Sequence, residues 1–489
     1  MIRPSRKVVD AAALYGSQFC NLAIGVILTP IAARALENPK EELGVWALLL
    51  LVSGFASIFA RGSLGSFTIR HASMTIDEKS SLYWMSLALG AATCSVVFLL
   101  SSSICAFLRI PEWTTGLMVL SCSFVPQAWQ GVAGALLRRE KRFGSMLIID
   151  LLRSVIQIIL TTILLTQGFG LWSYISVSLG ANIAIAIVAT LLTGWPKLVF
   201  KRSLCKEAWR YSSGLLGFNA INFWGRNLDN ALIGRVLGSA ALGIYSNAYR
   251  LMMLPVTTIN QVLQSLLLPY LAPYQAEPDL VRQKLMLSIR TLGLIVVPLM
   301  TVLWLECRTV ARWYFGPGWD DVGELLVILV PVGISQSLIS PLGVCYQVSG
   351  KTGVLFRLGL VNTLVLACGF LLGVQYDLMT FVWIYAGANA LLLYPTVRIG
   401  MGTVDGTFAD WLVGTWPLFA IPLASIMVQK LLIPEMPQDE ILHIGLTVAV
   451  IVFVSAMTMF LFLRDAIGFV VEQLGVWRSP RGGSAQLHL

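Results

Sequence analysis

Charged residues are scarce in this sequence, and their scarcity excludes most soluble architectures. Only 12% of the 489 residues are charged, whereas 57% are hydrophobic. An average soluble domain contains roughly 25% charged residues. The apolar residues form runs of roughly twenty, which is long enough for a helix to cross a lipid bilayer. The composition therefore predicts an all-α integral membrane protein.

Reactive and metal-binding residues are also few. The three histidines, His71, His443 and His488, lie in separate loops or in the tail, so they do not form a metal site. The eight cysteines include no CxxC pair and predict no disulfide framework. Ser349 to Thr352 imitates the end of a phosphate-binding loop, but Cys345 occupies the place of its first glycine. We expect no catalytic site, no metal site and no cofactor, and hence not an enzyme.

The basic residues indicate a membrane topology rather than a nucleic-acid partner. The formal charge of +9 comes from Lys and Arg in short loops between apolar runs. Short loops rich in Lys and Arg lie on the cytoplasmic side of a membrane. The chain begins with Arg3, Arg6 and Lys7, and the loops 138–142 and 197–206 are equally basic. We predict a multi-pass protein with both termini in the cytoplasm.

About fourteen membrane-spanning helices are predicted from the apolar runs, with short loops between them and no inserted soluble domain. They lie near residues 11–35, 43–60, 81–108, 114–137, 145–167, 170–194, 211–236, 241–268, 283–310, 321–347, 354–375, 378–400, 411–431 and 440–463. Because the number is even, both termini lie on the same side, and most of the basic residues fall on that side, which supports the count.

An internal repeat relates the first six spans to the next six. Four positions of the first span recur 201 residues later in the seventh: Gly16, Gln18, Asn21 and Arg34 correspond to Gly217, Asn219, Asn222 and Arg235. Leu43 to Trp46 then parallels Leu242 to Tyr245. The repeat predicts two six-helix lobes, residues 1–200 and 201–405, followed by two extra helices and a cytoplasmic tail in 406–489.

The seventh and eighth spans carry polar stripes on apolar helices, joined by a predicted turn at 238–243. Asn219, Asn222, Arg226 and Asp229 share one face of the seventh, and Arg250 and Gln261 lie on one face of the eighth. Ionisable groups facing hydrocarbon cost about 2.5–3.5 kcal/mol each, so they usually line a bundle interior. A buried polar cavity of this kind is typical of a transporter.

Each of these residues also has a structural interpretation. Arg226 and Asp229, three residues apart, either contact a ligand or neutralise each other. Arg153 either faces the cavity or pairs with Asp150, and Arg290 either contacts a ligand or extends toward the membrane surface. Amide stripes often hold helices together.

The run from Arg226 to Arg250 resembles the seventh and eighth spans of bacterial polysaccharide flippases. These are the Wzx-type, PST-branch members of the MATE-like multidrug/oligosaccharidyl-lipid/polysaccharide exporter superfamily. Leu82 to Trp84 and Phe315 to Trp319 extend the similarity. Arg61-Gly62 departs from it, because relatives often have an acidic residue before this glycine.

The resemblance implies two lobes around a central cavity that works by alternating access in the bacterial cytoplasmic (inner) membrane. The implied cargo is an undecaprenyl-diphosphate-linked oligosaccharide, moved to the outer leaflet for surface or exopolysaccharide assembly. Expected partners are this lipid-linked oligosaccharide, membrane lipid, and a polysaccharide polymerase with its chain-length machinery. The alternative is an ion-coupled small-molecule exporter of the multidrug type, which would need an acid in the first lobe, where Asp10 and Asp150 are available.

The predicted substrate-binding residues combine cations for a diphosphate with amides for sugar hydroxyls. They are Arg226, Asp229, Arg250, Asn219, Asn222, Gln18, Asn21, Gln261, Arg290 and Arg153. Tyr245 and Tyr249 are expected to stack on sugar rings.

Overall fold

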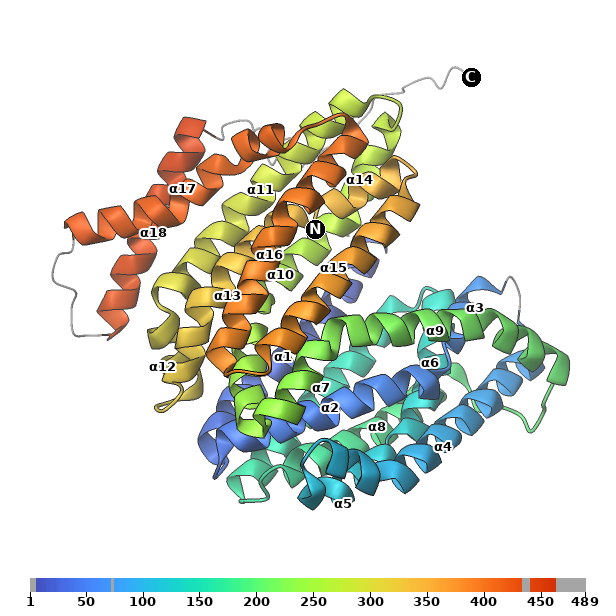
Figure 1. The fold of residues 1–489 in the computed structure, drawn as a ribbon. Helices are drawn as coiled ribbons and strands as arrows, with labels where there is room; N and C mark the ends of the chain where they lie inside the picture. Colours follow the sequence, from blue (N-terminus) through green and yellow to red (C-terminus); the bar gives the residue numbers. More distant parts are fainter. Residues whose placement is uncertain (1–5, 72–73, 433–439, 463–489) are drawn as a thin grey trace, which may run out of the picture. The chain divides into compact units, whose positions relative to one another are not determined.

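The computed structural model describes residues 6–71, 74–432 and 440–462, apart from the side chains of 6–15, 261–263, 265, 432, 440 and 441. Every regular element in these residues is helical (Figure 1). The chain divides into two compact units. Unit 1 comprises Met1–Ser246 and Tyr314–Gly316, and unit 2 comprises Asn247–Trp313 and Pro317–Leu489.

Unit 1 contains nine α-helices and the start of a tenth within the described residues. They are α1 (Arg6–Ala35), α2 (Pro39–Arg61), α3 (Leu64–Arg70), α4 (Ile76–Phe107), α5 (Thr114–Ser121), α6 (Phe124–Arg139), α7 (Phe143–Thr166), α8 (Trp172–Thr193), α9 (Arg202–Leu232) and the start of α10 (Ser239–Leu271). A short 3-10 helix, Pro111–Trp113, precedes α5, and a π-helix, Ile233–Leu237, follows α9.

Unit 2 begins inside α10 and holds the remaining described helices, except for the end of α12. They are α11 (Pro278–Leu305), α12 (Cys307–Phe315), α13 (Asp320–Ile339), α14 (Leu342–Val348), α15 (Thr352–Gly373), α16 (Leu378–Met401), α17 (Phe408–Leu432) and α18 (Glu440–Phe462). Single turns of 3-10 helix follow α10 and α16, at Ala272–Tyr274 and Gly402–Val404.

Eleven helical segments of the described chain are long and apolar enough to cross a membrane. Each coincides with one of the predicted spans. The other three predicted spans correspond to the broken pair α5 and α6 and to the long helices α9 and α10. The multi-pass all-α prediction is confirmed, whereas the count of fourteen and the domain boundaries at residues 200 and 405 stay predictions.

Local signals in the sequence set several helix ends. At α4, Thr75 and Glu78 form a reciprocal capping box, in which the Thr75 hydroxyl accepts from the Glu78 N–H at 3.3 Å. After α9, the π-helix ends at Gly238, whose φ of +96° suits glycine. The predicted turn at 238–243 is wrong for residues 239–243, because α10 already begins at Ser239. Only Gly238 forms the turn.

Polar contacts gather the basic loops at one end of unit 1. Lys79 Nζ lies 3.0 Å from Glu140, and Lys201 Nζ lies 3.7 Å from Glu78. Arg142 donates to the Leu192 carbonyl at 2.7 Å. The loops 138–142 and 197–206 therefore lie at the same end of the unit, as a shared membrane side requires. A buried cluster fills the space beneath them: Leu64, Phe67, Leu82, Tyr83, Val132, Ala133, Leu136, Leu137, Ile149, Ile185, Ala189, Leu204 and Ala208.

A close helix contact in unit 1 joins the starts of α2 and α10, the two segments that the predicted repeat relates. A Cβ on Gly44 would lie 1.7 Å from the Ser239 carbonyl oxygen, and one on Gly243 would lie 1.9 Å from that of Lys40. Each partner carbonyl lies four residues before the opposite glycine. The first turns of α2 and α10 thus touch backbone to backbone in a reciprocal arrangement, which only glycine permits.

Unit 2 is built around α11, which packs against α13, α17 and α18. Where α11 ends, the side chain of Glu306 is buried and accepts hydrogen bonds from Thr309 at 3.1 Å and Thr447 at 2.5 Å. His443 Nε2 lies 3.1 Å from the same carboxylate. This polar cluster ties α18 to the end of α11.

Candidate functional site

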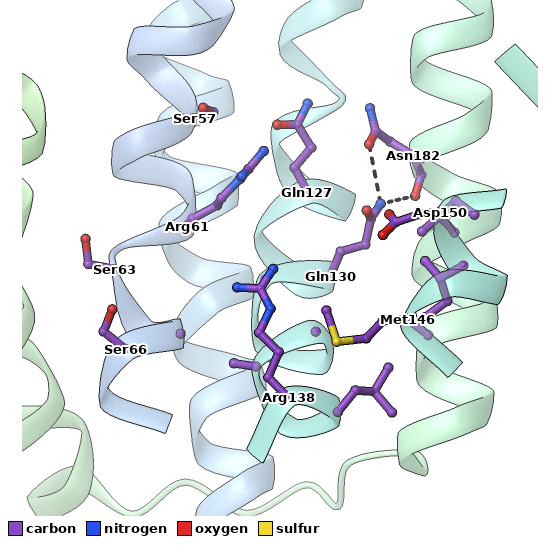
Figure 2. A pocket seen from close by; sticks show the side chains of 18 of the residues that line it. Ser57, Arg61, Ser63, Ser66, Gln127, Gln130, Arg138, Met146, Asp150 and Asn182 are labelled. Carbon is purple, nitrogen blue, oxygen red and sulfur yellow. Dashed lines mark hydrogen bonds between the residues drawn. The ribbon is translucent and has the colours of Figure 1, made fainter. Parts of the chain in front are cut away.

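Unit 1 contains a partly open polar cavity of about 470 Å³, a size typical of ligand pockets (Figure 2). Its walls come from α2, α3, α6, α7, α8 and α9. The polar lining consists of Ser57, Arg61, Ser63, Ser66, Gln127, Gln130, Arg138, Asp150, Arg153, Asn182 and Asn219. All of these residues belong to unit 1.

Arg61 reaches the cavity because α2 ends there. Gly62 and Ser63 both adopt left-handed conformations, with φ of +56° and +51°, and break the chain between α2 and α3. The stem of Arg61 passes Gly131 of α6, where an added Cβ would lie 3.7 Å from Cγ. Within the described residues its guanidinium has no hydrogen bond or ion pair. Figure 2 shows it pointing from α2 toward Gln127.

Arg153 is held by an amide network instead. Its Nη2 donates to Gln130 Oε1 at 2.6 Å. Gln130 Nε2 in turn donates to the Asn182 carbonyl at 2.5 Å (Figure 2). Asn182 in turn donates to the Ser178 carbonyl at 2.9 Å. Arg153 Nε is buried and has no partner in the described part of the chain. Three helices therefore orient one guanidinium and leave one of its donors unused.

Asp150 is the one carboxylate among the lining residues, and it accepts a hydrogen bond from a hydroxyl group. Ser17 Oγ of α1 donates to Asp150 Oδ2. No ion pair between Asp150 and Arg153 is present in the residues that the structure describes, although both belong to α7. Their predicted structural pairing is therefore not formed, and Arg153 stays available to the cavity.

The charged side chains that line the cavity give it a net positive charge. Arg61, Arg138 and Arg153 supply three positive charges against the single carboxylate of Asp150. Like that of Arg61, the guanidinium of Arg138 makes no hydrogen bond or ion pair in the described chain. Guanidinium groups present planar forks of donors that match phosphate and carboxylate oxygens. The arrangement is suited to an anion with several oxygen atoms.

The structure separates the predicted α9 stripe. Asn219 lines the cavity and donates to Ser63 Oγ at 3.4 Å, whereas Asn222 and Arg226 are exposed and do not line it. Asp229 is only 7% exposed and accepts from the Tyr245 hydroxyl at 2.9 Å and the Asn230 N–H at 2.8 Å. In the described residues Arg226 and Asp229 form no ion pair.

Tyr245 is fully buried against Asp229, so its ring is closed to a sugar and the predicted stacking is wrong at this position. In α1, Gln18 and Asn21 are exposed and do not line the cavity, and Asn21 donates to the Ser17 carbonyl at 3.0 Å.

The remaining predicted residues belong to unit 2. Arg250 is exposed on α10, and Arg290 Nε donates to the Gly414 carbonyl of α17 at 3.0 Å. The side chain of Gln261 lies outside the described residues. Among the ten predicted residues, the cavity brings together Arg153 and Asn219.

Sequence reasoning missed most of the lining. From the sequence, Arg61 is a charge in the second span and a departure from related sequences, and Arg138 is a loop cation, but neither is among the predicted binding residues. A signal was present in α6, where Gln127, Gln130, Gly131 and Gly134 recur at intervals of three and four residues on one helix face. Such a stripe in an apolar helix indicates a polar interior.

A family model described as "Polysaccharide biosynthesis protein" matches residues 31–324, which include every residue of the cavity. The lipopolysaccharide biosynthesis protein WzxC of Escherichia coli is 21% identical over 419 residues, or 83% of each chain. The teichuronic acid biosynthesis protein TuaB of Bacillus subtilis is 25% identical over 336 residues, 68% of this chain and 70% of its own.

A solved structure extends the comparison to the fold. The lipid II flippase MurJ, in its inward closed conformation, matches with a TM-score of 0.75 and 12% sequence identity. The match covers 94% of this chain and 100% of MurJ. At this identity the similarity shows a shared fold.

Proposed function

The chain belongs to the polysaccharide biosynthesis protein family, in agreement with its resemblance to Wzx-type exporters, and from this premise we propose that it is a flippase. Its cargo is an undecaprenyl-diphosphate-linked oligosaccharide. The protein moves this lipid from the inner to the outer leaflet of the bacterial cytoplasmic membrane for surface or exopolysaccharide assembly.

The observation that carries the proposal is the set of three arginines in a cavity with one carboxylate. A diphosphate offers several charged oxygens within a few ångströms. The guanidinium groups of Arg61 and Arg138 have no hydrogen-bond or ion-pair partner in the described chain, and Arg153 has an unused Nε. Charge-assisted hydrogen bonds to phosphate are short and roughly twice as strong as neutral ones. The cavity therefore offers unsatisfied hydrogen-bond donors to the diphosphate of the cargo, whose charged oxygens are acceptors.

The rest of the lining suits the sugar portion. Gln127, Gln130, Asn182 and Asn219 present amides, and three serines present hydroxyls. These groups donate and accept, so they adapt to sugar hydroxyls without a fixed charge. The long lipid tail needs no polar path and remains in the bilayer while the head crosses.

Transport by this route requires alternating access and a defined topology. We infer fourteen spans, two six-helix lobes related by the repeat, and both termini on the cytoplasmic side. The reciprocal contact of Gly44 and Gly243 supports the repeat, because equivalent residues of the two halves meet in the same way from each side. Moving one net charge through the membrane potential involves about 2.3 kcal/mol per 100 mV, so the cycle is sensitive to voltage.

A small-molecule exporter is the second candidate, favoured by one observation. Asp150 lies in the cavity and supplies the first-half acid that ion coupling would need. The excess of arginine in the same cavity argues for an anionic cargo and against the cationic compounds of many multidrug exporters.

A deletion strain tests the function. Loss of the protein leaves lipid-linked repeat units on the cytoplasmic leaflet and reduces surface polysaccharide, while glycosyltransferase activity in membranes persists. Normal surface polymer in a strain without a substitute flippase would contradict the proposal. Altered drug resistance with normal polymer would favour the second candidate.

Cysteine labelling tests the topology separately. In a cysteine-free background, Glu140→Cys and Gly318→Cys are probed with a membrane-impermeant thiol reagent on intact cells. We expect labelling at 318 and none at 140. The reverse pattern would overturn the inferred orientation.

A further inference from the structure

A second pocket of about 470 Å³ lies in unit 1, between the end of α3 and the first turns of α9. It is lined by Phe67, Arg70, His71, Glu207, Arg210 and Tyr211. It shares no residue with the cavity described above. The pocket therefore requires an explanation of its own.

Aromatic rings form the inner wall of this pocket. Phe67 is 5% exposed, and its ring centroid lies 5.6 Å from that of His71 and 6.0 Å from that of Tyr211. The Arg70 guanidinium carbon lies 5.1 Å from the Tyr211 centroid. A cation above an aromatic face is held without losing all of its hydrogen-bond donors. Arg70 is thus positioned, while its exposed side still offers N–H groups to a ligand.

The charges at the rim are unequal. Arg70 and Arg210 contribute two guanidinium groups, and Glu207 contributes one carboxylate. All three side chains are exposed. The balance favours an anion, and the carboxylate beside it is an acceptor for hydroxyl groups that the same ligand carries.

The segment that leads into α9 has the composition of a membrane surface. Trp195, Leu198 and Phe200 are 68%, 90% and 59% exposed. They alternate with Lys197 and Lys201. Exposed aromatic and aliphatic side chains beside basic ones are typical of chain that lies at the boundary of headgroups and acyl tails.

Backbone contacts fix this segment against the start of α4. The Lys197 N–H donates to Ser80 Oγ at 2.9 Å, and the Lys201 N–H donates to Ser81 Oγ at 2.8 Å. Trp84 Nε1 donates to the Lys197 carbonyl at 2.8 Å. The segment 195–201 is therefore fixed against α4, and its apolar side chains remain exposed.

The first turns of α9 continue the same pattern. Leu204 and Ala208 are buried in the core of unit 1, whereas Lys206, Trp209 and Arg210 are exposed on the other face. This part of α9 is amphipathic, with basic and aromatic residues outward. The second pocket therefore lies beside residues of the kind that membrane proteins place at the level of the lipid headgroups.

We propose that this pocket binds the headgroup of an anionic phosphoglyceride from the surrounding bilayer. Arg70 and Arg210 hold the phosphate through charge-assisted hydrogen bonds, and Glu207 accepts from the glycerol hydroxyls of the headgroup. Trp195 and Phe200 lie at the depth where the acyl chains begin. The inference is independent of the cargo and of the first cavity.

The test uses the purified full-length protein in nanodiscs of neutral lipid, to which phosphatidylglycerol is added. Bound lipid is counted by native mass spectrometry. We expect saturable binding that weakens at least tenfold in the double variant Arg70→Gln with Arg210→Gln. The matched control, Arg202→Gln with Lys206→Gln, removes two cations of the same helix end that do not line the pocket, and it should bind as the wild type does.

Two further arms distinguish the source of the phosphate. Inorganic phosphate and pyrophosphate are added as competitors, and phosphatidic acid, which lacks the second glycerol, replaces phosphatidylglycerol. We expect little competition, and we expect Glu207→Gln to abolish the preference for phosphatidylglycerol. Equal binding by the double variant and the wild type would overturn the proposal. Displacement by pyrophosphate at low concentration would overturn it in favour of a site for a soluble anion or for the diphosphate of the cargo.

Discussion

The two units use charged side chains in different ways. In unit 1, Arg61 and Arg138 face a cavity without a partner in the described chain. In unit 2, Arg282 lies 2.7 Å from Asp279 and donates to the Asp405 carbonyl at 2.6 Å. The buried Glu306 of unit 2 is likewise satisfied by neighbouring side chains.

The difference indicates that a charged side chain is suited to bind a ligand only if it is not already bonded to its neighbours. When a buried charge already has hydrogen-bond or ion-pair partners, those partners offset the free-energy cost of its desolvation. A ligand that approaches such a charge therefore gains little binding free energy. An unbonded guanidinium in a cavity retains its full capacity for an anion. On the proposed function we expect unit 1 to bind the charged part of the cargo, while the bonded charges named in unit 2 stabilise helix packing.

The largest expected effect concerns the glycine contact in unit 1. In Gly44→Ala or Gly243→Ala, the new Cβ would meet a backbone carbonyl at 1.7 or 1.9 Å, and neither backbone can move without separating α2 from α10. Since overpacking ordinarily costs about 1–3 kcal/mol, we expect a loss above this range. Thermal unfolding in detergent, followed by size-exclusion chromatography, measures it.

Gly214→Ala and Gly217→Ala are the controls for that experiment. Both positions lie in α9, and an added Cβ would meet nothing within 4 Å. Alanine also favours helix over glycine. Wild-type stability in Gly243→Ala would contradict the close contact.

A smaller effect is expected from a bonded arginine of unit 2. Arg290→Gln removes the hydrogen bond to the Gly414 carbonyl between α11 and α17. Hydrogen bonds from charged groups contribute about 1.5–3 kcal/mol, so the melting temperature should fall. Transport at matched protein abundance should persist. If transport were lost while stability was kept, Arg290 would belong to the binding site.

The smallest effect concerns Asp229, a bonded charge within unit 1. Tyr245→Phe removes the hydroxyl at 2.9 Å and leaves the Asn230 N–H as a donor. Leaving a buried acceptor short of one partner costs about 1–3 kcal/mol. We expect a modest loss of stability and near-normal transport in a lipid-flipping assay.

The double variant Arg226→Gln with Asp229→Asn extends this test, because the two residues form no ion pair in the described chain. Arg226 is exposed and Asp229 is bonded to Tyr245. We expect near-normal export at matched membrane abundance. A severe loss would assign Arg226 to cargo binding.

The sequence predicted the helical architecture well because apolar length is a strong and local signal. All eleven apolar segments matched predicted spans, from Gly16–Ala35 to Leu442–Phe462. The boundary between α9 and α10 was less predictable. The residues from Ser239 to Gly243 contain turn-forming types, yet close packing against the start of α2 stabilises them as helix.

The candidate site was predicted only in part. Spacing on one helix identified the polar face of α9, but it could not show which neighbours that face meets. Asp229 was satisfied by Tyr245 across a turn of chain, and Arg61 was brought to Gly131 by tertiary packing. Contacts between distant segments decide which polar groups remain unbonded, and no single-helix pattern contains that information.

The most direct test of the account removes the two unbonded arginines of unit 1. Purified Arg61→Gln with Arg138→Gln is compared with wild type in proteoliposomes containing a fluorescent undecaprenyl-diphosphate-linked oligosaccharide. Accessibility of the probe to a quencher reports its leaflet. Two lost contacts of about 1.5–3 kcal/mol each predict flipping slower by more than roughly a hundredfold. Lys351→Gln with Arg357→Gln removes two cations from unit 2 and should leave the rate unchanged. Near-normal flipping by the Arg61 and Arg138 double variant would contradict the central claim.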